Sequence, residues 1–126
     1  RYISYPGRTE LEIKDICDRL ALKSELWPEH DRYDIKIIFS NGTCWGIDAK
    51  TYGNPYLLSQ SIKNDYDFQS VHIDRKFYVI PDSIVANKKS YLKVCNDALK
   101  NSPAECVSMK AFYRKLKEEA GKRERN

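Results

Sequence analysis

The sequence contains no hydrophobic run that approaches the roughly 20 residues of a membrane-spanning helix, and no secretory signal peptide is visible in it. It also contains no internal repeat, no low-complexity tract and no segment typical of an interdomain linker. With 41% hydrophobic and 32% charged residues among 126, the composition predicts one globular domain over residues 1–126. Because the first residue is Arg1 rather than Met, we expect a fragment of a longer protein, one that makes no contact with a membrane.

The few cysteines show no metal-ligand pattern. Cys17, Cys44, Cys95 and Cys106 include no CxxC pair, and none lies at ligand spacing from a histidine, which argues against a zinc site. Each falls within a segment of apolar pattern, which favours a small buried side chain over a metal or redox role. Free thiols are typical of a reducing compartment, so we expect a cytoplasmic protein.

Two apolar runs on either side of Asn41-Gly42 predict a β-hairpin. A two-residue turn would place Asp34 and Asp48 on opposite faces of the sheet. A three-residue loop over residues 40–42, with the glycine left-handed in a bulge, would place Asp34 directly opposite Asp48, with Cβ atoms about 5 Å apart. Lys50 follows two residues later and shares that face. The loop length therefore decides whether these three side chains meet.

Two carboxylates and a lysine on one face suit the hydrolysis of a phosphodiester bond. Carboxylate and carbonyl oxygens are the ligands that Mg²⁺ prefers, so Asp34, Asp48 and the carbonyl of Ala49 predict a site for Mg²⁺ or Mn²⁺. Lys50 would position the attacking water and stabilise charge on the phosphorane. The alternatives are a surface ion pair for Asp48, a turn role for Asp34 and a solvated lysine at position 50.

The rest of the chain alternates predicted helices and strands, which indicates an α/β sheet covered on both faces. Thr9 and Glu12 predict a capping box at the first helix, and Asn54-Pro55 predicts the start of the helix after the hairpin. The sheet is expected to be antiparallel at the hairpin and parallel beyond it. The further elements are strands at 22–27, 76–80 and 106–107 and helices at 55–67, 88–99 and 109–120.

These features resemble a known family. A helix with an early glutamate, an acid on one strand, acid-x-lysine on the next, and then a helix and a strand are similar to the αβββαβ core of the PD-(D/E)xK nuclease superfamily, the restriction-endonuclease-like fold. This likeness covers roughly residues 6–81. The segments 6–12, 27–34 and 45–50, with Asn54-Pro55, look like those of the nuclease domain associated with prokaryotic PIWI-RE modules.

The resemblance implies a mixed central sheet flanked by helices, with an additional C-terminal helix-strand-helix. It implies a Mg²⁺-dependent endonuclease that hydrolyses DNA in prokaryotic defence against invading nucleic acid, together with a PIWI-like protein and a helicase. One such domain makes one cut, so double-strand cleavage would require a homodimer or a partner. The alternatives are an inactive nuclease-like fold that binds nucleic acid or protein within a defence complex, and a nuclease directed at RNA.

Glu10 and Glu12 compete for the helix carboxylate of this fold. Glu12 has a local explanation in the capping box, and the family pattern favours Glu10, which would bind metal or orient the water. The net charge of +4 mildly favours a polyanionic partner, although Glu118 and Glu119 interrupt the basic C-terminal helix. The candidate phosphate contacts are Arg8, Gln60, Arg75, Lys76, Lys110 and Arg114.

Overall fold

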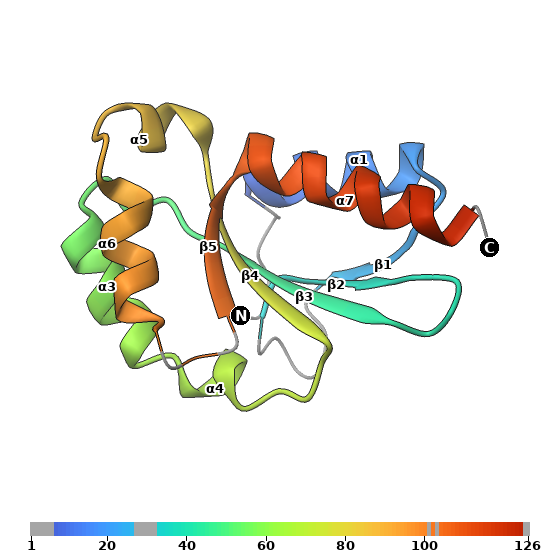
Figure 1. Ribbon diagram of the computed structural model, residues 1–126, viewed down its shortest axis with the longest axis horizontal. Coiled ribbons are helices and arrows are strands. Elements are labelled where there is room, and N and C mark those ends of the chain that lie inside the picture. The colour runs from blue at the N-terminus through green and yellow to red at the C-terminus, as the bar shows by residue number, and fades with distance from the viewer. Residues whose placement is uncertain (1–6, 27–32, 101, 103, 125–126) are drawn as a thin grey trace.

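Helices cover both faces of a five-stranded sheet in the computed structural model, which describes residues 7–26, 33–100, 102 and 104–124 (Figure 1). The strands are β1 (Lys23–Leu26), β2 (Ile35–Ile38), β3 (Cys44–Ala49), β4 (Arg75–Ile80) and β5 (Ala104–Ser108). The helices are α1 (Arg8–Arg19), α3 (Pro55–Lys63), α4 (Tyr66–Gln69), α5 (Asp82–Ala86), α6 (Tyr91–Ala98) and α7 (Met109–Glu124). Among the described residues, no helix is both long enough and apolar enough to cross a membrane.

The strands lie in chain order, β1-β2-β3-β4-β5. Strands β1, β2 and β3 pair antiparallel, whereas β4 pairs parallel to β3 and β5 parallel to β4. Both parallel connections pass through helices, as parallel strands require. The predicted α/β fold with a mixed sheet, antiparallel at the hairpin and parallel beyond it, is confirmed.

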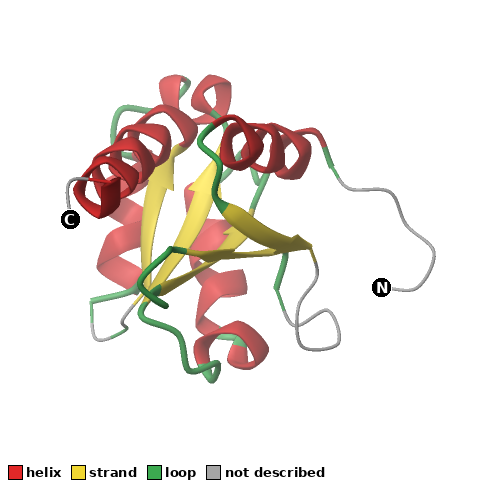
Figure 2. Ribbon diagram, turned by 90° about the vertical axis from the view of Figure 1, so that its right-hand side faces the viewer, coloured by secondary structure: helices red, strands yellow, loops and turns green. Residues whose placement is uncertain are grey.

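Two apolar clusters hold the helices to the sheet. Helices α1 and α7 cover one face and α3, α4 and α6 cover the other, so the sheet forms the middle layer (Figure 2). The α1/α7 side is centred on Trp45, whose ring centroid lies 5.1 Å from that of Phe77. The opposite side contains Leu58, Phe68 and Tyr78. Full burial of each large apolar side chain stabilises the fold by about 1.5–3 kcal/mol.

The hairpin closes through the three-residue loop predicted from its sequence. The Phe39 N–H donates to the Thr43 carbonyl at 2.8 Å, and the Gly42 N–H donates to the Phe39 carbonyl at 2.9 Å. Gly42 has a φ of 93°, in the left-handed region that glycine adopts without a steric penalty. Ile35 is therefore opposite Ile47, and this register places Asp34 opposite Asp48.

The first helix begins differently from the prediction. Gly7 is the N-cap of α1, and no side chain caps the helix, so the predicted Thr9–Glu12 capping box is wrong. The Leu11 N–H donates to the Gly7 carbonyl, which places Thr9 inside the first turn. Glu12 instead lies one turn after Arg8, at 3.6 Å from its Nε atom. The Asn54 cap is confirmed, because its side chain accepts a hydrogen bond from the Tyr56 N–H at 2.8 Å.

The helix predicted over 55–67 is divided into two. Helix α3 ends at Lys63, and Asp65 begins α4 by accepting a hydrogen bond from the Phe68 N–H at 3.3 Å. Aspartate is favoured at this position because its side chain satisfies an N–H group of the first turn. Helix α5, directly after Pro81, was not predicted from the sequence.

Gly46 lets α4 approach β3 closely. A Cβ atom at position 46 would lie 3.1 Å from the ring of Phe68 and 3.2 Å from the ring of Tyr33, and would overlap the end of Ile73. Only a residue without a side chain leaves room for these groups. The aromatic rings thus cover the strand directly before Asp48.

Candidate active site

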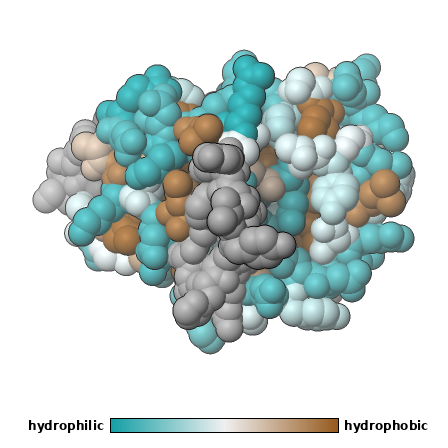
Figure 3. Space-filling model, turned by 180° about the vertical axis from the view of Figure 1, so that it is seen from behind, coloured by the Kyte–Doolittle hydropathy of each residue, from teal (hydrophilic) through white to brown (hydrophobic). Residues whose placement is uncertain are grey.

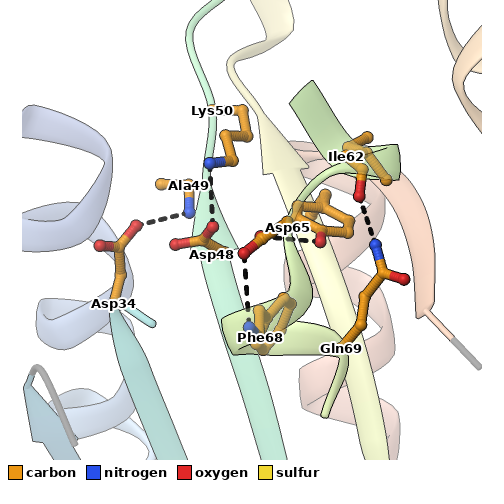
Figure 4. A network of polar contacts seen from close by, with 9 residues as sticks. Asp34, Asp48, Ala49, Lys50, Ile62, Asp65, Phe68 and Gln69 are labelled. Atoms are coloured by element: carbon orange, nitrogen blue, oxygen red, sulfur yellow. Dashed lines mark hydrogen bonds and ion pairs between the residues drawn. The ribbon is translucent and has the colours of Figure 1, made fainter. Parts of the chain in front are cut away.

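Asp34, Asp48 and Lys50 lie together on the sheet face opposite α1 and α7. Asp34 and Asp48 are 4% and 8% exposed, respectively. The Lys50 Nζ atom lies 3.0 Å from Asp48 Oδ2, and the Ala49 N–H donates to Asp34 Oδ2 at 2.8 Å (Figure 4). The end of one strand and the start of its neighbour therefore bring together the three side chains that the sequence predicted to meet.

Burial and mutual repulsion set the protonation of the carboxylate pair. Burial, as the largest cause, together with the negative charge of Asp34 and a hydrogen bond to it, raises the pKa of Asp48 to about 8, and the charge of Lys50 opposes this rise. Burial by itself lowers the pKa of Lys50, but the charge of Asp48, followed by those of Asp65 and Asp34, outweighs burial and raises it. At neutral pH, the carboxyl group of Asp48 therefore retains a proton in the folded protein.

This donor set fits a hydrated divalent cation. Two buried carboxyl groups that repel each other gain from a cation between them, and the Ala49 carbonyl lies in the same stretch of β3. Mg²⁺ typically takes one or two carboxylates and keeps several waters or substrate phosphate oxygens as its other ligands. Within the described residues, no group of three or more His, Cys, Asp or Glu side chains is arranged to hold a metal ion. The described side chains therefore leave most positions around such a cation to water or phosphate oxygens.

Glu10 and Glu12 lie on different sides of α1. Glu10 is buried on the side of the helix that also carries Ile13 and Cys17, whereas Glu12 is exposed beside Arg8. Helix α1 lies on the Asp34 side of the site (Figure 4). Of the two glutamates, Glu10 is thus the one held against the body of the protein.

Asp65 and Tyr78 join the site, although sequence reasoning did not find them. The Tyr78 hydroxyl donates to Asp65 Oδ2 at 2.9 Å, and Asp65 Oδ1 accepts from the Phe68 N–H. Tyr78 is buried and is the β4 residue paired with Asp48. The sequence shows a tyrosine within an apolar strand and an aspartate three residues before Phe68. Only the β3–β4 register connects these two residues with Asp48.

Arg75 and Lys76 have structural partners. The Arg75 guanidinium lies 5.1 Å from the ring centroid of Trp45 and donates to Glu105 at 2.8 Å. Lys76 is buried, and its Nζ atom donates to the Gln69 carbonyl at 2.5 Å. Burial also lowers the pKa of Lys76. These contacts argue against the phosphate contact predicted for Lys76, because its strand face is covered by the segment that contains α4.

The other predicted phosphate contacts lie at the surface. Arg8, Gln60, Lys110 and Arg114 are all exposed. A hollow of about 550 Å³ opens next to Thr51, the residue after Lys50, between the starts of α1, α5 and α7. Seen from behind, the described surface is largely hydrophilic, with apolar patches separated by polar residues (Figure 3).

The family described as "REase associating with pPIWI_RE", where REase denotes a restriction endonuclease, matches residues 7–124. The chain belongs to this family. The match includes α5, α6, β5 and α7 as well as the region of the predicted likeness, so the resemblance to nuclease domains associated with PIWI-RE modules is confirmed over nearly the whole chain. No curated protein and no solved structure matches the chain. Within the predicted likeness, residues 27–32, including His30, lie outside the described residues.

Proposed function

We propose that the domain is a metal-dependent endonuclease that hydrolyses DNA phosphodiester bonds in prokaryotic defence against invading nucleic acid. The observation that carries the proposal is the register of the hairpin. It places Asp34 opposite Asp48, with Lys50 at 3.0 Å from Asp48, in a chain of a restriction-endonuclease family. A nuclease needs carboxylates for a cation and a positive group for the phosphate at one point, and this hairpin supplies both.

Each residue of the site has a role in this proposal. Asp34 and Asp48, with the Ala49 carbonyl, would hold Mg²⁺ or Mn²⁺, and Glu10 would support them from α1. The metal, when bound, supplies a water of lowered pKa and neutralises charge on the phosphate. Lys50 would orient the attacking water through its ammonium group and stabilise the pentavalent phosphorane. The Ala49 N–H holds the Asp34 carboxylate in place.

The hollow beside Thr51 offers a path for the nucleic-acid strand. It is lined by Arg8, which pairs with Glu12, by Thr9 and Ser83 and by apolar side chains, and its Asp82 accepts a hydrogen bond from the Lys110 N–H. Exposed Lys110 and Arg114 extend from this hollow along α7 and would meet backbone phosphates. A PIWI-like protein and a helicase are the proposed partners, and a second copy or a partner would supply the second cut of a duplex.

The alternative is an inactive module that binds nucleic acid or protein. The absence of a three-ligand metal group among the described residues and the Lys50–Asp48 ion pair favour it. The intact acid-x-lysine sequence favours the nuclease. The nuclease and the inactive module differ in whether a divalent cation leads to cleavage of the nucleic acid.

The test is cleavage of single- and double-stranded DNA and RNA in Mg²⁺, Mn²⁺ or EDTA. We expect DNA to be cut only with a divalent cation, and the rate to fall at least about 100-fold in Asp48→Ala and Lys50→Ala, as when a group that stabilises the transition state is removed. Lys63→Ala, which removes an exposed lysine from α3, is the matched control and should cut normally. Binding that is independent of the cation, without cleavage, would support the inactive module, and cleavage of RNA alone would redirect the proposal to RNA.

A further inference from the structure

Asp65 is a third carboxylate beside the Asp48–Lys50 pair. It occupies the junction between α3 and α4, where hydrogen bonds from the Tyr78 hydroxyl and the Phe68 N–H fix both of its oxygens. Tyr78 is the strand neighbour of Asp48 in the parallel β3–β4 pair. Figure 4 shows the carboxylates of Asp48 and Asp65 on the same side of these strands.

Capping of α4 does not by itself require a charge at position 65. Asparagine accepts a hydrogen bond from a helix N–H about as well as aspartate. A partly buried carboxylate is costly unless a cation lies near it. The Lys50 ammonium supplies that cation: its Nζ atom lies 3.0 Å from Asp48 Oδ2, and Asp65 lies on the same side of the two strands, within electrostatic range of it (Figure 4). Only 21% of the Lys50 side chain is exposed, so few positions are open to its ammonium group.

We propose that Asp65 is a positioning residue that acts as a second anchor for the Lys50 ammonium. Lys50 then keeps a carboxylate partner when Asp48 binds a metal ion. In the absence of Asp65, Lys50 and a metal ion would compete for the same Asp48 oxygens. The catalytic consequence rests on the proposed nuclease function, but the attraction between Asp65 and Lys50 does not.

A double-mutant cycle without metal tests the anchor. Asp65→Asn keeps the cap of α4 and removes the charge, and Lys50→Met removes the cation and keeps an unbranched chain. We expect Asp65→Asn to lower the Tm in EDTA by at least about 3 °C more with Lys50 present than with Met at position 50, because the effects of two charges that attract each other are not additive. The matched cycle with Asp67→Asn, which neutralises an exposed acid of the same helix, should be additive. Additivity in the Asp65 cycle would overturn the proposal.

Calorimetry with Mn²⁺ as the probe measures the competition. Asp65→Asn should weaken Mn²⁺ binding about fivefold when Lys50 is present, and less than twofold in the Lys50→Met background. Equal weakening in both backgrounds would show that Asp65 acts on the cation by itself and would overturn the anchor. No Mn²⁺ binding in the wild-type protein would contradict the proposed function, and the metal-free cycle would still decide the anchor.

Cleavage kinetics separate positioning from a purely structural role. Asp65→Asn should lower kcat about tenfold with KM changed less than twofold, since Lys50 acts on the reacting phosphate rather than on substrate binding. Asp67→Asn should change neither parameter. A rise in KM with unchanged kcat in Asp65→Asn would contradict positioning of Lys50.

Discussion

The two faces of the β2–β3 hairpin contrast sharply within a few residues. On one face, Ile35, Ile37, Trp45 and Ile47 are fully or almost fully buried against α1 and α7. On the other face, alternate positions of the same strands carry the two aspartates, Lys50 and a glycine, beneath aromatic side chains of other segments.

One short hairpin thus contributes both to the stability of the sheet and to the chemistry of the site. The strand alternation assigns every second residue to the core, where apolar burial stabilises the sheet. The remaining positions are free to hold buried like charges that a fold by itself would avoid. The apolar face therefore has to fix the register rigidly enough to keep Asp34 and Asp48 together, since a slip of one residue would separate them.

Truncation on the apolar face should produce the largest loss of stability. We expect Trp45→Ala to lower the free energy of unfolding by about 4 kcal/mol, because a large buried ring leaves a cavity among Phe39, Phe77 and Phe112. Urea denaturation measures the change. Lys36→Ala, on the opposite face of β2, is the control and should cost less than about 1 kcal/mol. Equal losses in the two variants would remove the contrast between the faces.

Neutralising the site face should raise stability in a pH-dependent way. Between its ordinary pKa of 3.8 and its folded value of about 8, Asp48 is ionised in the unfolded chain and keeps a proton in the folded one. The stability contributed by this proton is therefore full near pH 4, falls as pH rises, and is lost above about pH 8.

Asp48→Asn removes that dependence. In EDTA, we expect the variant to be more stable than the wild-type protein by about 2 kcal/mol at pH 8.5, with a smaller gap at pH 5. Urea denaturation at the two pH values is the measurement. If the stability difference between Asp48→Asn and the wild-type protein instead grew toward pH 5, Lys50 would stabilise the ionised form of Asp48, and burial would not dominate its pKa.

A single methyl group at position 46 should disturb the packing of α4 against β3. Gly46→Ala places a Cβ atom against the rings of Phe68 and Tyr33, and we expect a loss of about 1–2 kcal/mol as α4 shifts. Thermal denaturation measures the loss. In Gly53→Ala, the added Cβ atom has no neighbour within 4 Å among the described residues, so this control should change stability by less than about 0.5 kcal/mol. Similar Tm values for both variants would show that α4 tolerates displacement.

The local parts of the site could be predicted from the sequence. Turn chemistry at residues 40–42 and strand alternation are short-range rules, and together they reduced the register to two loop lengths, of which the three-residue loop places Asp34 opposite Asp48. The Asn54 cap is equally local. The capping box at Thr9 was wrong because the helix begins two residues earlier, with Gly7 as its N-cap.

The long-range parts could not be predicted. Asp65 and Tyr78 reach the site through the parallel pairing of β3 with β4, and the 25 residues between these strands, 50–74, contain no turn rule that sets this register. The burial of Lys76 follows from the same pairing, because it shares the covered face of β4 with Tyr78. The assignment of Lys50 and Glu10 to catalysis stays a prediction.

The central claim is that Asp34 and Asp48 together bind one divalent cation. Calorimetric titration of the protein with Mn²⁺ at pH 7.5 tests it most directly, with Asp34→Asn and Asp48→Asn as the variants and Asp67→Asn as the matched control. We expect a single site in the wild-type protein and in the control, weakened at least about tenfold in each of the other two variants. Undiminished Mn²⁺ binding in either Asp34→Asn or Asp48→Asn would contradict it.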